Sequence, residues 1–219
     1  MEKIITVKGI GHVSVKPDLV VVSLELKTIN PNYDHCMKLS GERSDLLKEA
    51  VKKSGLPDDS LKTTDFEIST EYHSVKMKDG NYHQVFDGWK CSHDMKVEFS
   101  LDINQLTKLL HHVAKSGISC ETSVKFTITD PSNVQTELLA SAAKNAKTKA
   151  ETLCTAVGAK LGEIVKIDYN WSEINIYSRT KYGSGLFDES PMPMCCSAPE
   201  IDPEDIDVSD NAIFIWRIE

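Results

Sequence analysis

Residues 130–158 constrain the fold most, because they carry the pattern of one long amphipathic helix with both ends marked. Asp130 is a favoured N-cap, Pro131 suits the first helical turn, and Gly158 can adopt the left-handed conformation that commonly ends a helix. Small and apolar residues recur on one face at intervals of three or four: Val134, Leu138, Ala142, Ala146, Ala150, Leu153 and Val157. An alanine-rich face lets a helix approach a sheet or another helix closely. The pattern predicts an architecture and no particular reaction.

The length of 219 residues allows either one large domain or two lobes, and it suffices for a substantial core without disulfides or metals. We expect residues 1–219 to form a single domain.

Acidic residues outnumber basic ones, 33 against 25, which gives a formal net charge of −8. This charge disfavours non-specific attraction to nucleic acid or to an anionic membrane surface. Three lysines of the long helix, Lys144, Lys147 and Lys149, are interrupted by other residues and fit a solvated helix face. We therefore expect no nucleic-acid partner.

The N-terminus has no apolar leader pattern, because strand-like residues begin at Ile4. The longest apolar run, 19–26, is interrupted by Ser23 and Glu25 and is too short to span a bilayer. The six cysteines lack the paired spacing of a secreted disulfide scaffold. These features predict a cytoplasmic protein with reduced thiols, or a periplasmic or secreted one if a leader has been removed.

Alternating apolar residues predict strands over 5–15 and 20–26, joined as a hairpin at Lys16-Pro17-Asp18. A helix is predicted from Asn30-Pro31 to Gly55, with Gly41 as a weak point inside it.

A second hairpin is predicted around Asp79-Gly80, with strands over 64–77 and about 82–101 and a bend near Gly88. A short helix over 104–116 and strands over 123–129 and 163–171 complete the middle of the chain. Residues 174–205 are rich in glycine, proline and acids and predict a flexible loop, followed by a returning strand over 206–218.

The two longer helices have similar residues at their starts and ends. Asn30-Pro31 precedes the one that ends at Gly55, and Asp130-Pro131 precedes the one that ends at Gly158. This similarity fits either a remote duplication into two β-α-β lobes or two uses of common helix signals.

The order of these elements resembles the SIMPL domain family, also called domain of unknown function 541. The resemblance covers about residues 4–218. It rests on the following residues in order: Gly9, Gly11, Pro17-Asp18, Gly55, Lys62-Thr63-Thr64, Tyr72, Gly88-Trp89, Phe126, Asp130, Ala143, Ala146, Lys149-Ala150, Leu153, Gly158, Leu161-Gly162 and Pro191-Met-Pro-Met194.

This resemblance implies an α+β fold in which helices pack on antiparallel sheets. Bacterial members include periplasmic immunogenic proteins and proteins linked to oxidative stress, and some assemble into large rings. The family has no established enzymatic activity, so the resemblance supplies no catalytic residues. The absence of a leader in this chain departs from many bacterial members.

Gly9-Ile-Gly11 superficially matches the start of a dinucleotide-binding loop. Ser14 stands where the third glycine belongs, and a strand pattern follows instead of a helix. We interpret the two glycines as a bend or bulge between strands.

Histidines occur in two arrangements that could suggest metal binding. With Asp79 and Gly80 as the loop, His73 and His83 would face opposite sides of the ribbon, although a shift of one residue would reverse this. His111 and His112 are adjacent on a helix and fit an exposed or half-buried pair better than a ligand pair.

Soft ligands cluster at one place, formed by Met192, Met194, Cys195 and Cys196. Thiolates and thioethers select Cu(I), and adjacent thiols can sense oxidants. The opposing interpretation is a flexible loop whose methionines contact a neighbour.

No nucleophile motif is present, and Asp65, Glu67 and Glu71 alternate on a strand as solvated surface residues do. We therefore expect no catalytic residues, no cofactor and no enzymatic activity. The favoured function is a self-associating assembly or interaction protein. The alternative is a small-molecule, Cu(I) or thiol-redox protein that uses the methionine and cysteine cluster.

Overall fold

The computed structural model describes residues 3–76, 80–170, 174–180, 182–184 and 202–219. Contacts divide the chain into two compact units. Unit 1 comprises Met1–Asp18, Thr127–Arg179 and Pro203–Glu219, and unit 2 comprises Leu19–Phe126 and Thr180–Asp202. Each unit contains an antiparallel sheet with helical packing, so the predicted α+β class is confirmed.

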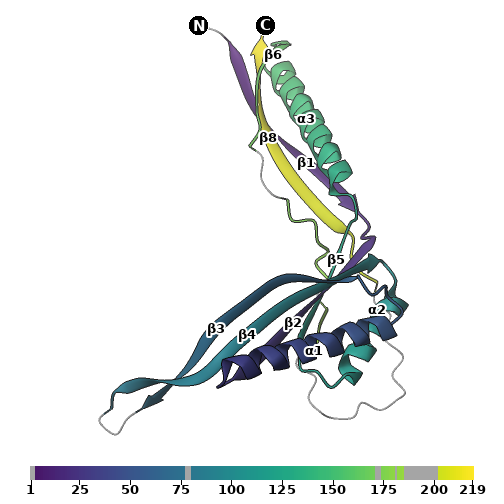
Figure 1. Ribbon diagram of the computed structural model, residues 1–219. Coiled ribbons are helices and arrows are strands. Elements are labelled where there is room, and N and C mark those ends of the chain that lie inside the picture. Colours follow the sequence, from purple (N-terminus) through teal and green to yellow (C-terminus); the bar gives the residue numbers. More distant parts are fainter. Residues whose placement is uncertain (1–2, 77–79, 171–173, 181, 185–201) are drawn as a thin grey trace. The chain divides into compact units, whose positions relative to one another are not determined.

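Unit 1 is a three-stranded sheet covered by one long helix (Figure 1). Its strands are β1 (Ile4–Val15), β8 (Ile206–Ile218) and β6 (Leu161–Asp168), in the order β1-β8-β6. The helix is α3 (Pro131–Ala156). The central strand β8 pairs with β1 over its whole length, from Val15 opposite Ile206 to Ile4 opposite Arg217.

Helix α3 approaches β1 closely because two glycines leave room for it. A Cβ built on Gly9 would lie 2.2 Å from the carbonyl oxygen of Ala142, and one built on Gly11 would lie 2.1 Å from that of Leu138. Neither glycine has a positive φ, and both lie within the regular β1 ladder. The interpretation of this pair as a bend or bulge is therefore wrong. Its role is to admit the helix.

The same helix also covers the edge of β1 that no strand occupies. The amides of Ile10 and His12 donate to Asn145 Oδ1 at 3.0 Å and to Ser141 Oγ at 3.2 Å. Lys149 Nζ donates to the carbonyl oxygen of Lys8 at 3.2 Å. Side chains of α3 thus satisfy strand groups that would otherwise be open to pairing with another chain.

The predicted helix over 130–158 is confirmed with its signals. The Asp130 side chain accepts from the Ser132 amide, and Gly158 has a φ of +72°. The buried stripe departs from the prediction at its end, since Leu153 and Val157 are exposed and Cys154 is buried. Buried positions recur every fourth residue because α3 packs along an i±4 ridge. They are Val134, Leu138, Ala142, Ala146, Ala150 and Cys154.

Unit 2 contains a five-stranded sheet in the order β3-β4-β2-β5-β7 (Figure 1). The strands are β2 (Leu19–Asn30), β3 (Leu61–Lys76), β4 (Tyr82–Ser100), β5 (Glu121–Thr127) and β7 (Tyr182–Ser184). The helices are α1 (Tyr33–Lys53) and α2 (Ile103–Lys115). The predicted second hairpin is β3–β4, and the bend near Gly88 coincides with a register irregularity between β3 and β4.

The core of unit 2 lies between its sheet and the helices α1 and α2. Strand β2 contributes alternate residues from Val20 to Leu26, and α2 contributes Leu106 and Leu109. Phe126 at the end of β5 is fully buried. This alternation is what a sheet covered on one face requires.

The predicted hairpin of residues 5–15 with 20–26 is wrong. Strand β1 pairs with β8 and β2 pairs with β4, so the two strands belong to different sheets. Lys16-Pro17-Asp18 has the composition of a turn but carries the chain from one unit into the other.

Part of the predicted loop 174–205 is ordered against unit 1. Ile176 is buried beside Val134, Leu138 and Ile206, and its carbonyl oxygen accepts from Thr127 Oγ1. Residues 181 and 185–201 lie outside the described residues. The duplication hypothesis stays a prediction: α1 packs on β2, the strand before it, whereas α3 packs on β1 and β8.

Candidate functional site

Three carboxylates form a row across the sheet of unit 2. Glu25 on β2 and Asp65 on β3 both lie opposite Asp94 on β4. Among the described residues, Asp94 Oδ1 is a buried side-chain oxygen without a hydrogen-bond partner. Burial raises the pKa of Asp94, and the charges of Glu25 and Asp65 raise it further. Asp94 therefore takes up a proton more readily than an ordinary aspartate does.

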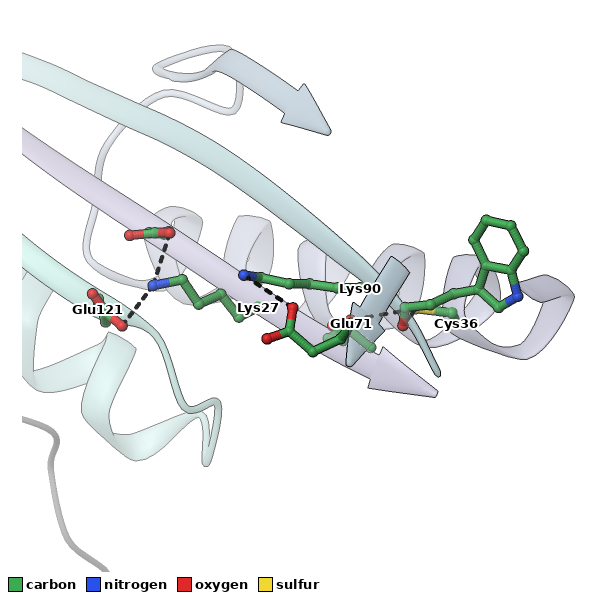
Figure 2. Close-up of polar contacts among 8 residues, drawn as sticks. Lys27, Cys36, Glu71, Lys90 and Glu121 are labelled. Carbon is green, nitrogen blue, oxygen red and sulfur yellow. Dashed lines mark hydrogen bonds and ion pairs between the residues drawn. The ribbon is translucent and has the colours of Figure 1, made fainter. Parts of the chain in front are cut away.

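Lys27 neutralises one end of the row (Figure 2). Its Nζ lies 2.8 Å from Glu121 and 2.9 Å from Glu25, and the hydrogen bonds to these two residues raise the pKa of the lysine. A second pair joins Lys90 Nζ to Glu71 at 3.6 Å. A lysine whose pKa is raised in this way does not serve as a base, so the contacts of Lys27 form a surface charge network and not an acid–base centre.

The expectation of solvated carboxylates on β3 is confirmed for Asp65 and Glu67, which are exposed, whereas Glu71 is half-buried. Sequence reasoning missed Asp94, which the β4 pattern places beside buried Met95. Within the described part of the chain, no three histidine, cysteine, aspartate or glutamate side chains are grouped to hold a metal ion.

The register predicted for the two ribbon histidines is wrong by one residue. His73 pairs with Val85 and His83 pairs with Val75, so both imidazoles face the same side of the ribbon. His73 Nδ1 is hydrogen-bonded to Asp87. His111 and His112 are exposed and half-buried respectively, as predicted.

A group of sulfur atoms lies between α1 and β4. Cys36 Sγ is 3.3 Å from Cys91 Sγ, and Met37 Sδ is 3.8 Å from Cys91 Sγ. Cys36 Sγ also lies 3.1 Å from the carbonyl oxygen of Trp89. Both cysteines are fully buried, and burial raises the pKa of Cys91 to about 11, with a smaller contribution from Cys36. Cys36 is labelled in Figure 2.

Sequence reasoning missed this group because 55 positions separate the two cysteines. The cluster that it proposed instead, Met192, Met194, Cys195 and Cys196, lies outside the described residues. Its role in Cu(I) binding or thiol redox chemistry stays a prediction.

Aromatic rings form a row from α1 onto the β3–β4 ribbon. The ring of Tyr33 lies edge-on to Trp89 at 5.1 Å, Trp89 contacts Phe86 at 6.4 Å, and Phe86 contacts Tyr72 at 5.5 Å. Trp89 is half-buried, whereas Tyr33, Tyr72 and Phe86 are exposed. Tyr82 lies farther along the same face of the ribbon and is 68% exposed. We call these five residues the aromatic row.

Unit 1 has a shallow hollow between β1 and α3, lined by Val7, Thr148, Lys149, Thr152 and Leu153. None of these lining residues is a histidine, cysteine, aspartate or glutamate. Across the described ranges, no helix has the length and apolar character needed to cross a membrane.

Comparison with known proteins gives two results. The profile of the family described as "SIMPL: Protein of unknown function (DUF541)" matches residues 5–214. The 26 kDa periplasmic immunogenic protein of Brucella abortus is 26% identical over 163 residues, which cover 74% of this chain and 65% of the relative. The protein of the same name from Brucella melitensis biotype 1 gives the same values. The match thus spans somewhat less than two thirds of each relative.

These relatives correct one expectation. The sequence predicted a cytoplasmic protein, yet both relatives are named as periplasmic proteins. The prediction failed because it took the first residues of this sequence as evidence about an export signal.

Proposed function

Because the chain belongs to the SIMPL family, we propose that it is a non-enzymatic periplasmic protein that works by assembling with further copies of itself. The observation that carries the assembly proposal is the aromatic row on the β3–β4 ribbon. Support for the location comes from the two relatives named as periplasmic.

The ribbon lacks the support that the rest of its sheet has. Strand β2 pairs with β4 only from Trp89 to Ser100, whereas β3 continues along β4 to Tyr82. Among the described residues, the ribbon beyond Trp89 is therefore two-stranded, and Figure 1 shows β3 and β4 continuing past the end of β2. An isolated two-stranded ribbon is marginally stable in water, so a partner that covers it would stabilise it.

The side chains on one face of the ribbon suit a protein partner. Tyr72, Phe86 and Tyr82 lie on the same face by register and are 51%, 43% and 68% exposed. Aromatic side chains are enriched at the centres of protein interfaces, where they bury large areas at little entropic cost. A second copy of the chain offers an identical face, as a two-fold symmetric dimer requires.

Free sheet edges add a second means of association. The edge of β1 is covered by α3, but β3 is an outer strand of its sheet and β6 is an outer strand of the other. Strand β6 also exposes Ile164, Val165 and Ile167. Exposed apolar edge strands are sites of pairing between chains.

Light scattering coupled to size-exclusion chromatography tests the proposal on the reduced protein. We expect a discrete oligomer for the wild type and a smaller species for the double variant Tyr72→Ser/Phe86→Ser. Val157→Ser is the matched control, because Val157 is a 77% exposed apolar residue at the C-cap of α3 and belongs to unit 1. A monomeric wild type would overturn the assembly proposal. A double variant that forms an oligomer of the wild-type size would show that the aromatic row is not the assembly surface.

The metal content of the same chromatographic peak tests the alternative function. Stoichiometric copper that is lost in Cys195→Ser/Cys196→Ser would favour soft-metal binding over assembly. Fractionation of the source cells by osmotic shock tests the location, and recovery with cytoplasmic marker enzymes would contradict it.

A further inference from the structure

The buried thiols of Cys36 and Cys91 lie closer together than non-bonded sulfur atoms ordinarily approach. Their Sγ atoms are 3.3 Å apart, and a disulfide bond requires about 2.05 Å. Cys36 lies near the start of α1 and Cys91 lies in β4, so the two thiols belong to different elements of unit 2.

The other described cysteines have different surroundings. Cys120 Sγ contacts Thr122 Oγ1 at 3.6 Å, and Cys154 is a buried residue of α3 in unit 1. Cys36 and Cys91 are the one pair of cysteines in sulfur–sulfur contact among the residues that the structure describes.

We propose that Cys36 and Cys91 are a disulfide-forming pair, which joins α1 covalently to β4 when the chain folds in an oxidising compartment. This inference does not depend on the proposed assembly, but it rests on the proposed periplasmic location. Disulfides form and persist in the bacterial periplasm, the compartment named for both relatives.

The oxidant is a disulfide, either of a small molecule or of a dithiol oxidoreductase. A thiolate of one cysteine attacks a sulfur of the oxidant, which breaks the S–S bond of the oxidant and releases its first thiol. The second cysteine then attacks the mixed disulfide and releases the second thiol. The protein loses two protons and two electrons, and the oxidant gains them as it becomes two thiols.

Because both cysteines are buried in the folded protein, their rate of oxidation depends on whether the chain has folded. In the folded reduced protein both cysteines are inaccessible, and the raised pKa of Cys91 keeps it a thiol at neutral pH. Thiols react poorly compared with thiolates, so oxidation is fast while the chain folds and slow once α1 has docked on the sheet.

The test uses the full chain, unfolded in guanidinium and refolded in a mixture of reduced and oxidised glutathione. The refolded protein is then unfolded again in guanidinium, and its free thiols are alkylated with iodoacetamide. Of the six cysteines, we expect four to be alkylated after oxidative refolding and all six after reducing refolding. Trypsin should release a linked pair of peptides, residues 28–38 and 91–96, that separates on reduction.

Thermal unfolding supplies the second readout. Closing a long loop restricts the unfolded chain, so the oxidised protein should melt on the order of 5–10 °C above the reduced one. This difference should disappear in Cys36→Ala and in Cys91→Ala and persist in Cys120→Ala. If a variant fails to fold, the peptide map of the wild type decides by itself.

Three results would overturn the proposal. These are six alkylated cysteines after oxidative refolding, a disulfide that involves the peptide containing Cys195 and Cys196 in place of the predicted pair, or an oxidised form that melts below the reduced one. If the folded reduced protein were oxidised as fast as the refolding chain, the proposal that oxidation occurs before α1 docks on the sheet would be wrong.

Discussion

At the scale of single residues, Gly9 determines how closely α3 packs on β1. An alanine there would place its Cβ 2.2 Å from a backbone oxygen, which cannot swing aside as a side chain can. We expect Gly9→Ala to lower the free energy of unfolding by about 2 kcal/mol or more, measured by urea denaturation. Gly41→Ala is the matched control, because a Cβ at this position of α1 meets nothing within 4 Å. Alanine should stabilise there by about 1 kcal/mol, and equal effects at both sites would refute the explanation.

Asp94 makes stability depend on pH. Its pKa is raised on folding, first by burial and then by Glu25 and Asp65, so the folded state binds this proton more tightly than the unfolded state. The carboxylate therefore costs stability above its folded pKa, and the cost fades as the pH falls toward the ordinary value of 3.8.

We expect Asp94→Asn to stabilise the protein at pH 7 by about 0.5 kcal/mol, the size of a cross-strand charge contact. The gain should vanish below pH 3.8, where the wild-type carboxyl is protonated in both states. Thermal unfolding of both proteins across this range measures the difference, and a gain that is independent of pH would contradict it.

At the scale of elements, the contribution of the N-cap of α3 to stability can be tested directly by substitution. Asp130 Oδ1 accepts from the Ser132 amide at 3.0 Å, and Oδ2 accepts from Asn133 Nδ2 at 2.9 Å. Asp130→Ala should cost about 1 kcal/mol in chemical denaturation, whereas Asp130→Asn should keep most of the stability because asparagine caps as well as aspartate. Equal losses would show that something other than the cap is responsible.

Elements defined by local chemistry were predictable from the sequence, and their partners were not. Asp130 and Gly158 mark the ends of α3, and the Asp79-Gly80 pattern in the sequence predicted the hairpin of β3 and β4. The partner of β1 is β8, some 200 positions away, and no local pattern reports it. Lys16-Pro17-Asp18 misled because turn composition also suits a connection between units.

The residues of the candidate site were likewise predictable only where the local sequence determines their surroundings. The solvated carboxylates of β3 follow from alternation, but the approach of Cys36 to Cys91 depends on how α1 docks. One signal was present: Cys36 belongs to the stripe that continues through Ser40, Ser44 and Leu47, which places it on the buried face of α1.

At the scale of the whole molecule, the two units share one interleaved chain. Unit 1 is assembled from three separate segments, and the chain passes between the units after Asp18, Phe126, Arg179 and Asp202. We therefore predict that residues 1–219 unfold as a single domain in one transition.

Tryptophan fluorescence can follow each unit separately, since Trp89 lies in unit 2 and Trp216 lies in unit 1. Two variants, each retaining one of these tryptophans and carrying phenylalanine at the other positions, should report the same guanidinium midpoint. Separate midpoints would show that the units fold independently.

The position of β8 in the sequence determines which of the two units can fold first during synthesis. The strand that holds the three-stranded sheet together is the last one in the sequence, so β1 and β6 have no partner until the final residues arrive. A ribosome synthesises the chain from its N-terminal side, and a translocation channel can pass it in the same order. Unit 2 is therefore complete before β8, the central strand of unit 1, is available. A chain that stops short of Ile206 lacks that strand altogether, so the three-stranded sheet of unit 1 cannot form until β8 has been made.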